Sequence, residues 1–293
     1  MLPQADRKQI YADTRAVMYH KVGTTVLLGT DNAVLTRMVS LAATGLYSNY
    51  SMIILYTQTL ISQLLGNFTP SVGNARQKMT ETEYYTLFRK ITFMGLWISC
   101  VVSVCFYTAL DDLIAVWLGS KYILGGAVTL ALCVSFHLTI ARTTNSAFIN
   151  ADGLFVKDRI RPLIEAGLNL GISIALTKLY GIVGVFLGTI LSSLLTIVWR
   201  EPLLLYRYSF KRNVMEYWTI YGGFTLIAVL TGAGIWFLKT RIRFSPTWGT
   251  LILESAAAFL VVNGILYLLF RKRDEFQYMI QLIKRLINRR TAK

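Results

Sequence analysis

The strongest constraint in this 293-residue sequence is a series of apolar runs, each about 20 residues long or longer. A helix of about 20 residues rises about 30 Å, which matches the hydrocarbon core of a bilayer. Because 54% of all residues are hydrophobic and only 15% are charged, the composition is also more apolar than that of a typical soluble domain. The sequence therefore predicts an all-α, polytopic membrane protein with about eight transmembrane helices. The runs occupy residues 22–41, 44–68, 90–110, 123–149, 161–179, 181–206, 217–238 and 248–270.

Lysine and arginine are distributed unevenly between the segments that join these runs. One alternating set of segments, which includes both ends of the chain, holds 23 of the 30 cations, and two more lie inside runs. The other set holds Lys121, Lys178, Lys239, Arg241 and Arg243. Cations concentrate in cytoplasmic loops of membrane proteins, so both termini are predicted in the cytoplasm. Nucleic acid is not expected as a partner, since the cations form short clusters rather than one basic face.

Four regions follow from this pattern. Residues 1–21 contain no apolar signal sequence and predict a cytoplasmic or interfacial lead-in helix. Residues 22–206 form a six-helix bundle, and residues 207–270 add two transmembrane helices. Residues 271–293 form a basic amphipathic tail, expected to bind anionic membrane lipids, with partner binding as the alternative.

Polar residues recur at helical spacing in four of the runs. Polar groups are costly in hydrocarbon and usually face a hydrated interior, so these stripes predict a cavity wall. Close helix packing is the alternative, because small polar residues are common at membrane-helix contacts. The candidate cavity-lining residues are Asn32 in the first run, Ser51, Gln58 and Ser62 in the second, Ser135, Thr139, Arg142 and Ser146 in the fourth, and Asn169 in the fifth.

Arg37 and Arg142 lie inside otherwise apolar runs. A guanidinium in such a place needs an anionic ligand or a counter-charge. We expect Arg142 to contact a ligand, and the alternative is a structural ion pair with Asp31, Glu165 or Asp152. In the first run, Thr25, Gly29, Asn32, Thr36 and Ser40 form a stripe of small and polar residues. Asp31 and Arg37 lie beside this stripe, so they are placed to meet neighbouring helices.

Several other residues are expected to have packing roles. His137 lies on the face opposite Arg142, and the three cysteines fall in apolar runs without metal-binding spacing. The same applies to the small-residue face formed by Gly181, Gly184, Gly188 and Ser192.

No enzyme motif is present in the sequence. There is no GxSxG, HExxH, P-loop or glycine-rich phosphate-binding pattern, and only two histidines occur. We therefore expect neither catalysis nor a cofactor.

Three segments together resemble a known family. GTDNAVLTRMVSLAATGLYSNYSMIILYTQTLISQLLGNFTPSVGN at 29–74, DDLIAVWLGSKYIL at 111–124 and RPLIEAGLNLGISIALTKLYGIVGVFLGTILSSLLTIVWREPLLLY at 162–206 occur in the order and spacing of the second half of bacterial polysaccharide flippases. These flippases belong to the multidrug/oligosaccharidyl-lipid/polysaccharide exporter superfamily. The resemblance covers most of residues 20–206, and after Tyr206 only hydropathy agrees.

The resemblance implies a transporter in the bacterial cytoplasmic membrane that moves a lipid-linked oligosaccharide for cell-surface polysaccharide biosynthesis. The arginines would hold its pyrophosphate, and Asp31 or Glu165 would couple transport to an ion. Family members have two lobes, and this sequence resembles only the second, so we expect a truncated chain or one that pairs with a first-half chain or with polysaccharide assembly proteins. A multidrug cation antiporter of the same superfamily and a non-transporting assembly partner are the alternatives.

Overall fold

The computed structural model describes residues 4–66, 69–242 and 245–291, which are 90% helical and contain no strand. The α-helices are α1 (Gln4–Val34), α2 (Leu41–Gly66), α3 (Thr69–Lys78), α4 (Glu81–Trp117), α5 (Gly126–Ala141), α6 (Thr143–Ala151), α7 (Arg161–Tyr180), α8 (Ile182–Leu195), α9 (Ile197–Leu204), α10 (Met215–Arg241), α11 (Trp248–Phe270) and α12 (Asp274–Thr291). Four short segments complete the fold: the 3₁₀-helices η2 (Ser120–Tyr122) and η3 (Leu154–Asp158) and the π-helices η1 (Leu35–Val39) and η4 (Leu205–Phe210).

Six helical segments of the described chain are long and apolar enough to cross a membrane. They are Glu81–Trp117, Gly126–Ala151, Arg161–Tyr180, Ile182–Phe210, Met215–Arg241 and Trp248–Phe270. These segments coincide with the last six apolar runs of the sequence. The first two runs lie in α1, η1 and α2, which are not among these six segments, so the count of eight crossings stays a prediction.

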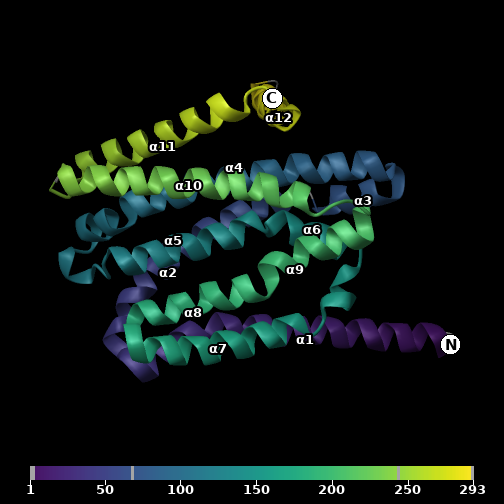
Figure 1. The fold of residues 1–293 in the computed structure, drawn as a ribbon, viewed down its shortest axis with the longest axis horizontal. Coiled ribbons are helices and arrows are strands. Elements are labelled where there is room, and N and C mark those ends of the chain that lie inside the picture. Colours follow the sequence, from purple (N-terminus) through teal and green to yellow (C-terminus); the bar gives the residue numbers. More distant parts are fainter. Residues whose placement is uncertain (1–3, 67–68, 243–244, 292–293) are drawn as a thin grey trace.

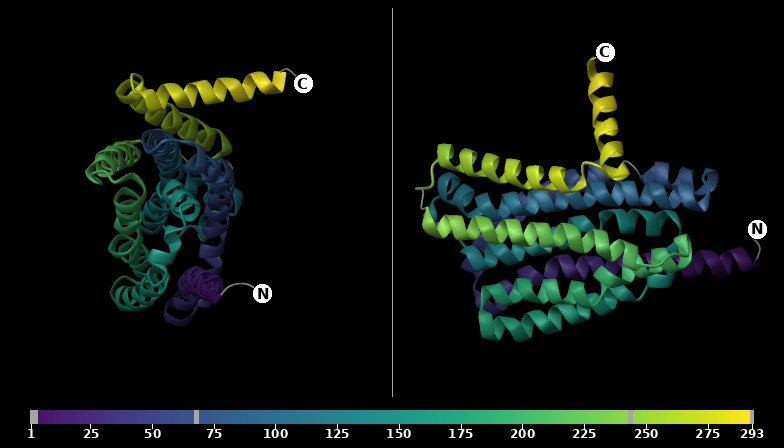
Figure 2. Two further views of the ribbon diagram at one scale, coloured as in Figure 1. Left: turned by 90° about the vertical axis from the view of Figure 1, so that its right-hand side faces the viewer. Right: turned by 45° about the horizontal axis from the view of Figure 1, so that its top comes forward.

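The long helices lie roughly parallel along one axis, and α12 crosses the bundle (Figures 1 and 2). α4 occupies a central place because it packs against α5, α10, α11 and α12. A second group is formed by α1, α7 and α8, and α5 joins it to the first through α8. A large buried aromatic cluster, which includes Tyr84, Phe88, Phe148, Tyr206 and Phe210, fixes α4 against α6 and η4.

Helices α1 and α2 separate after the turn at η1. α1 packs on α7, whereas α2 packs on α4, α5 and α6, and the two have little direct contact. Tyr50, Ile54, Ile61 and Leu65 form the buried face of α2. Ser51, Gln58 and Ser62 lie along one flank of that face and are half-buried.

A single helix, α1, runs from Gln4 to Val34, so the expected lead-in and most of the first run belong to one helix. No proline interrupts this stretch. Gly23 lies so close to Pro162 that an added Cβ would be 2.6 Å from the Pro162 Cβ. This glycine therefore brings α1 against the first turn of α7.

Two expected helices are interrupted. The run at 123–149 is divided at Arg142, whose backbone joins α5 to α6, and the run at 181–206 is divided at Thr196 between α8 and α9. Pro202 lies inside α9 and cannot donate a backbone hydrogen bond, and η4 follows as a π-helix. Such interruptions are tolerated at membrane depth only where other groups satisfy the backbone or where a cavity is lined.

The basic connecting segments share one end of the bundle. The N-terminal part of α1, α3 and the α6–α7 connection lie at this end, and the α4–α5, α7–α8 and α10–α11 connections lie at the other, whereas α12 crosses the bundle nearer to the first end than to the second (Figure 1). The alternation predicted from the lysine and arginine positions therefore agrees with the geometry of the helices.

Candidate functional site

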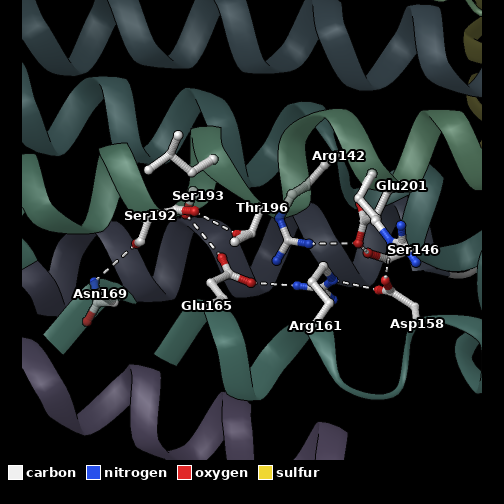
Figure 3. Close-up of polar contacts among 12 residues, drawn as sticks. Arg142, Ser146, Asp158, Arg161, Glu165, Asn169, Ser192, Ser193, Thr196 and Glu201 are labelled. Atoms are coloured by element: carbon white, nitrogen blue, oxygen red, sulfur yellow. Dashed lines mark hydrogen bonds and ion pairs between the residues drawn. The ribbon is translucent and has the colours of Figure 1, made fainter. Parts of the chain in front are cut away.

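A group of six charged side chains connects η3, α7, α9 and the α5–α6 junction (Figure 3). It contains three carboxylates, of Asp158, Glu165 and Glu201, and all three residues are less than 5% exposed. Three guanidinium groups, of Arg142, Arg161 and Arg200, balance them. The group is formally neutral, as expected for charges held away from water.

Arg161 is the centre of the first part of this group. Its Nε lies 2.5 Å from Asp158 Oδ2, and its Nη1 lies 2.5 Å from Glu165 Oε2. Figure 3 shows the two carboxylates on either side of the guanidinium. Arg200 Nε adds a contact of 3.3 Å to Asp158 Oδ1, and Ser193 donates to Glu165. These bonds fix the η3 segment against the first turn of α7 and against α9.

Arg142 forms the second part. Its Nη1 donates to Glu201 Oε1 over 2.9 Å, and the Ser146 hydroxyl donates to the same oxygen over 3.0 Å. The Arg142 side chain is 30% exposed, whereas that of Glu201 is only 4% exposed. A guanidinium has five N–H donors, and Glu201 accepts from one nitrogen, so Arg142 keeps donors for an anionic ligand.

A line of side-chain hydrogen bonds leads from α7 through α8 to α1. The Asn169 Nδ2 donates to Thr189, and the Thr189 hydroxyl donates to Asp31 Oδ1 over 2.8 Å. Asn169 is buried and also lies 3.5 Å from the Ser192 hydroxyl. Because Asn169 follows Glu165 by one helical turn, the line adjoins the charged group.

The structure brings together five of the predicted residues: Arg142, Ser146 and Glu165 in the charged group, and Asn169 and Asp31 in the adjoining line. Asp31 meets the neighbouring helix α8, as its position beside the stripe predicted. Arg142 has a carboxylate partner, but this partner is Glu201 and none of Asp31, Glu165 or Asp152. Asp152 instead accepts from Tyr84 over 2.7 Å and pairs with Arg76.

The other predicted residues lie elsewhere. Arg37 is exposed in η1, at the end of the bundle opposite the charged group, so it does not join Arg142. Asn32 is exposed on α1, and Ser51, Gln58 and Ser62 border the buried face of α2. Ser135 and Thr139 are half-buried on α5, where Thr139 donates to the Ser135 carbonyl.

Asp158, Arg161, Arg200 and Glu201 belong to the charged group but were not among the sequence candidates. Asp158 lies between two predicted runs, and the other three lie within six residues of the end of a run, where charges are ordinary. The usable signal was the spacing of Asp158, Arg161 and Glu165, because residues three and four apart lie on the same helix face.

His137 has the structural role expected from its position. Its two ring nitrogens contact the hydroxyls of Ser99 on α4 and Thr225 on α10, at 2.9 Å and 3.1 Å. The imidazole therefore links three helices.

Within the described residues no group of three or more His, Cys, Asp or Glu side chains is arranged to hold a metal. No protein-family model, curated protein or solved structure matches the chain.

Proposed function

We propose that this chain forms the second lobe of a transporter that moves a polyprenyl-pyrophosphate-linked oligosaccharide across the bacterial cytoplasmic membrane for cell-surface polysaccharide biosynthesis. The resemblance of three ordered segments in residues 29–206 supports this substrate class. In this proposal α1 and α2 supply two further crossings, giving eight, and both termini are cytoplasmic.

The half-exposed guanidinium of Arg142 is the observation that carries the proposal. It lies where α5 ends and α6 begins, and its ion pair with Glu201 joins it to α9, which begins at the interruption of the neighbouring span. Interrupted helices that meet at buried charged groups are typical of substrate sites in secondary transporters.

The chemistry of Arg142 suits a pyrophosphate. A planar guanidinium can donate two parallel hydrogen bonds to phosphate oxygens and keeps its charge when buried. Since the charged group is formally neutral, attraction comes from oriented donors rather than from net charge. Glu165 in the charged group and Asp31 at the end of the adjoining line remain the candidates for ion coupling.

A reconstituted flipping assay tests the substrate class. The chain is placed in vesicles with and without a first-lobe chain from a flippase of the resembled family, and a fluorescent pyrophosphate-linked oligosaccharide is followed between leaflets. We expect this substrate to move between the leaflets. An excess of the corresponding pyrophosphate lipid should inhibit that movement. Transport of cationic drugs without movement of the oligosaccharide would instead assign the chain to the antiporter class, and no transport in either preparation would assign it to an assembly role.

A further inference from the structure

A second feature at the basic end of the bundle is a cavity of about 740 Å³ formed by η3, α7, α8 and α9. Its volume is in the range of ordinary ligand sites. Four cationic side chains line it, those of Lys157, Arg159, Arg161 and Arg200, and a single carboxylate, that of Asp158. Arg161 and Arg200 belong to the neutral charged group, where carboxylates balance them, so the excess of positive charge on the cavity wall comes from Lys157 and Arg159.

Two of these cations have no carboxylate partner among the described residues. Lys157 lies over the ring of Tyr208, with its Nζ 4.0 Å from the ring centre, and Arg159 is exposed without an ion pair. Arg200 uses only its Nε toward Asp158, so its terminal nitrogens keep their donors. Asp158 itself is 2% exposed and already contacts two guanidinium groups. The cavity thus offers donors for an added anion.

The rest of the cavity wall is apolar and outward-facing. Ile160, Ile164 and Leu195 are each more than half exposed, and Trp199 is 44% exposed. A small water-soluble anion makes no favourable contact with apolar side chains, whereas a lipid carries acyl chains directly beside its charged headgroup. Lys157 and Arg159 lie just before the first turn of α7, and long cationic side chains next to the end of a spanning helix are typical of the level of the headgroups.

We propose that this cavity binds the phosphate headgroup of an anionic phospholipid, with Lys157 and Arg159 as the residues that select its charge. The occupant is a lipid of the surrounding bilayer, and the inference does not depend on the transport substrate. Each cation near the membrane surface strengthens the binding of an anionic lipid. Removing the charges of both Lys157 and Arg159 is therefore expected to weaken phospholipid binding about tenfold or more.

Native mass spectrometry of the purified full chain tests this assignment, with phosphatidylglycerol and zwitterionic phosphatidylcholine added in equal amounts. We expect preferential retention of phosphatidylglycerol. The Lys157→Gln/Arg159→Gln variant should lose most of it, and the charge-conserving Lys157→Arg/Arg159→Lys variant should keep it. Circular dichroism and size-exclusion chromatography show whether each variant is folded.

The matched control is Lys178→Gln/Arg241→Gln, which also removes one lysine and one arginine at exposed positions, outside the cavity and outside the basic tail. This control should retain phosphatidylglycerol like the unchanged chain. Equal loss in both double variants, or equal retention of the two lipids, would overturn the proposal. Displacement of phosphatidylglycerol by inorganic phosphate would also overturn it, by assigning the cavity to a free anion.

Discussion

At the scale of single residues, Gly184 and Gly188 determine how closely α7 and α8 approach. A Cβ at Gly184 would lie 2.2 Å from the Leu176 carbonyl oxygen, and one at Gly188 would lie 2.6 Å from the Ser173 Cα. Both contacts involve backbone atoms, which cannot move aside cheaply. The packing role predicted for this face is confirmed at Gly184 and Gly188, whereas Gly181 ends α7 with a positive φ, and a Cβ added there would meet nothing within 4 Å.

We predict that Gly188→Ala destabilises the protein, because α7 and α8 must separate to accept the methyl group. Overpacking of this kind costs about 1–3 kcal/mol. Reaction of a thiol dye with Cys100 and Cys133, which are both buried, measures the unfolding midpoint. Gly171→Ala on α7 is the control, because its Cβ would meet nothing within 4 Å. Equal midpoints for the two variants would contradict the close-contact explanation.

Thr189 supplies a hydrogen bond to Asp31, so a valine at this position would remove it with little change of shape. Leaving the partly buried carboxylate without this donor costs about 1–3 kcal/mol. We predict a lower unfolding midpoint for Thr189→Val in the same dye assay. Thr25→Val, at an exposed position on α1, should leave the midpoint unchanged. If both valines had the same effect, the Thr189–Asp31 bond would have no special importance.

The sequence located some of these residues better than others. Gly184, Gly188 and Asp31 could be placed because helical spacing fixes which face of its own helix a residue occupies. Glu201 could not be paired with Arg142, because 59 residues separate them and only the fold brings α9 against α6. Partners that are far apart in the sequence depend on how the helices pack. The periodicity of polar and apolar residues gives no information about that packing.

At the scale of elements, α12 is attached to α4 by an ion pair, by the Lys90 ammonium over the Tyr278 ring, and by an apolar contact. Glu275 pairs with Arg89, and the Phe276 ring lies 5.4 Å from the Trp97 ring. The apolar stripe of the amphipathic tail consists of Phe276, Met279, Ile280, Ile283, Leu286 and Ile287. Phe276 and Met279 are buried, so this stripe packs partly on protein. The positions of Leu286 and Ile287 in that stripe lie outside the described side chains.

We predict that Phe276→Ala releases α12 from the bundle without unfolding it, because the change removes the aromatic contact with Trp97 and leaves most of the bundle core unchanged. Hydrogen exchange of the amides in 274–285 should become faster, while exchange in α5 stays the same. Ile283→Ala is the control, since Ile283 is 44% exposed. Unchanged exchange of α12 in Phe276→Ala would show that another contact holds this helix.

Element boundaries show where hydropathy succeeds and where it does not. α11 begins and ends at the predicted residues, 248 and 270, because apolar and polar residues change sharply there. The interruptions at Arg142 and Thr196 were not predicted, because no glycine or proline lies within four residues of either position. α3 was also missed, since this short helix is polar and carries no periodic apolar face.

At the scale of the whole molecule, the count of eight crossings depends on α1 and α2. If both cross the membrane, η1 lies on the outer side together with the α4–α5 connection. If neither did, η1 would lie on the side of the basic segments, and α1 would have to leave its contact with α7. Cysteine accessibility separates these two arrangements.

In a chain whose own three cysteines are replaced by alanine, we predict that Val39→Cys and Lys121→Cys react with a membrane-impermeant reagent added outside intact cells, because the α1–α2 turn and the α4–α5 connection share one end of the bundle (Figure 1). Lys157→Cys and Lys272→Cys, at the basic end, should react only after the cells are opened. Protection of Val39→Cys in intact cells, with Lys121→Cys reactive, would contradict eight crossings.

The most direct test of the transport proposal is the flipping rate of the pyrophosphate-linked oligosaccharide in a mutant cycle of Arg142 and Glu201. Arg142→Gln should reduce the rate at least about tenfold, and Arg142→Lys should keep part of it, because a lysine retains the charge but loses the bidentate fork. Adding Glu201→Gln to Arg142→Gln removes the unpaired buried carboxylate and restores stability. If Arg142 holds the substrate, the double variant stays slow. If the double variant recovers the unchanged rate, Arg142 serves only to neutralise Glu201, and the proposed substrate contact is wrong.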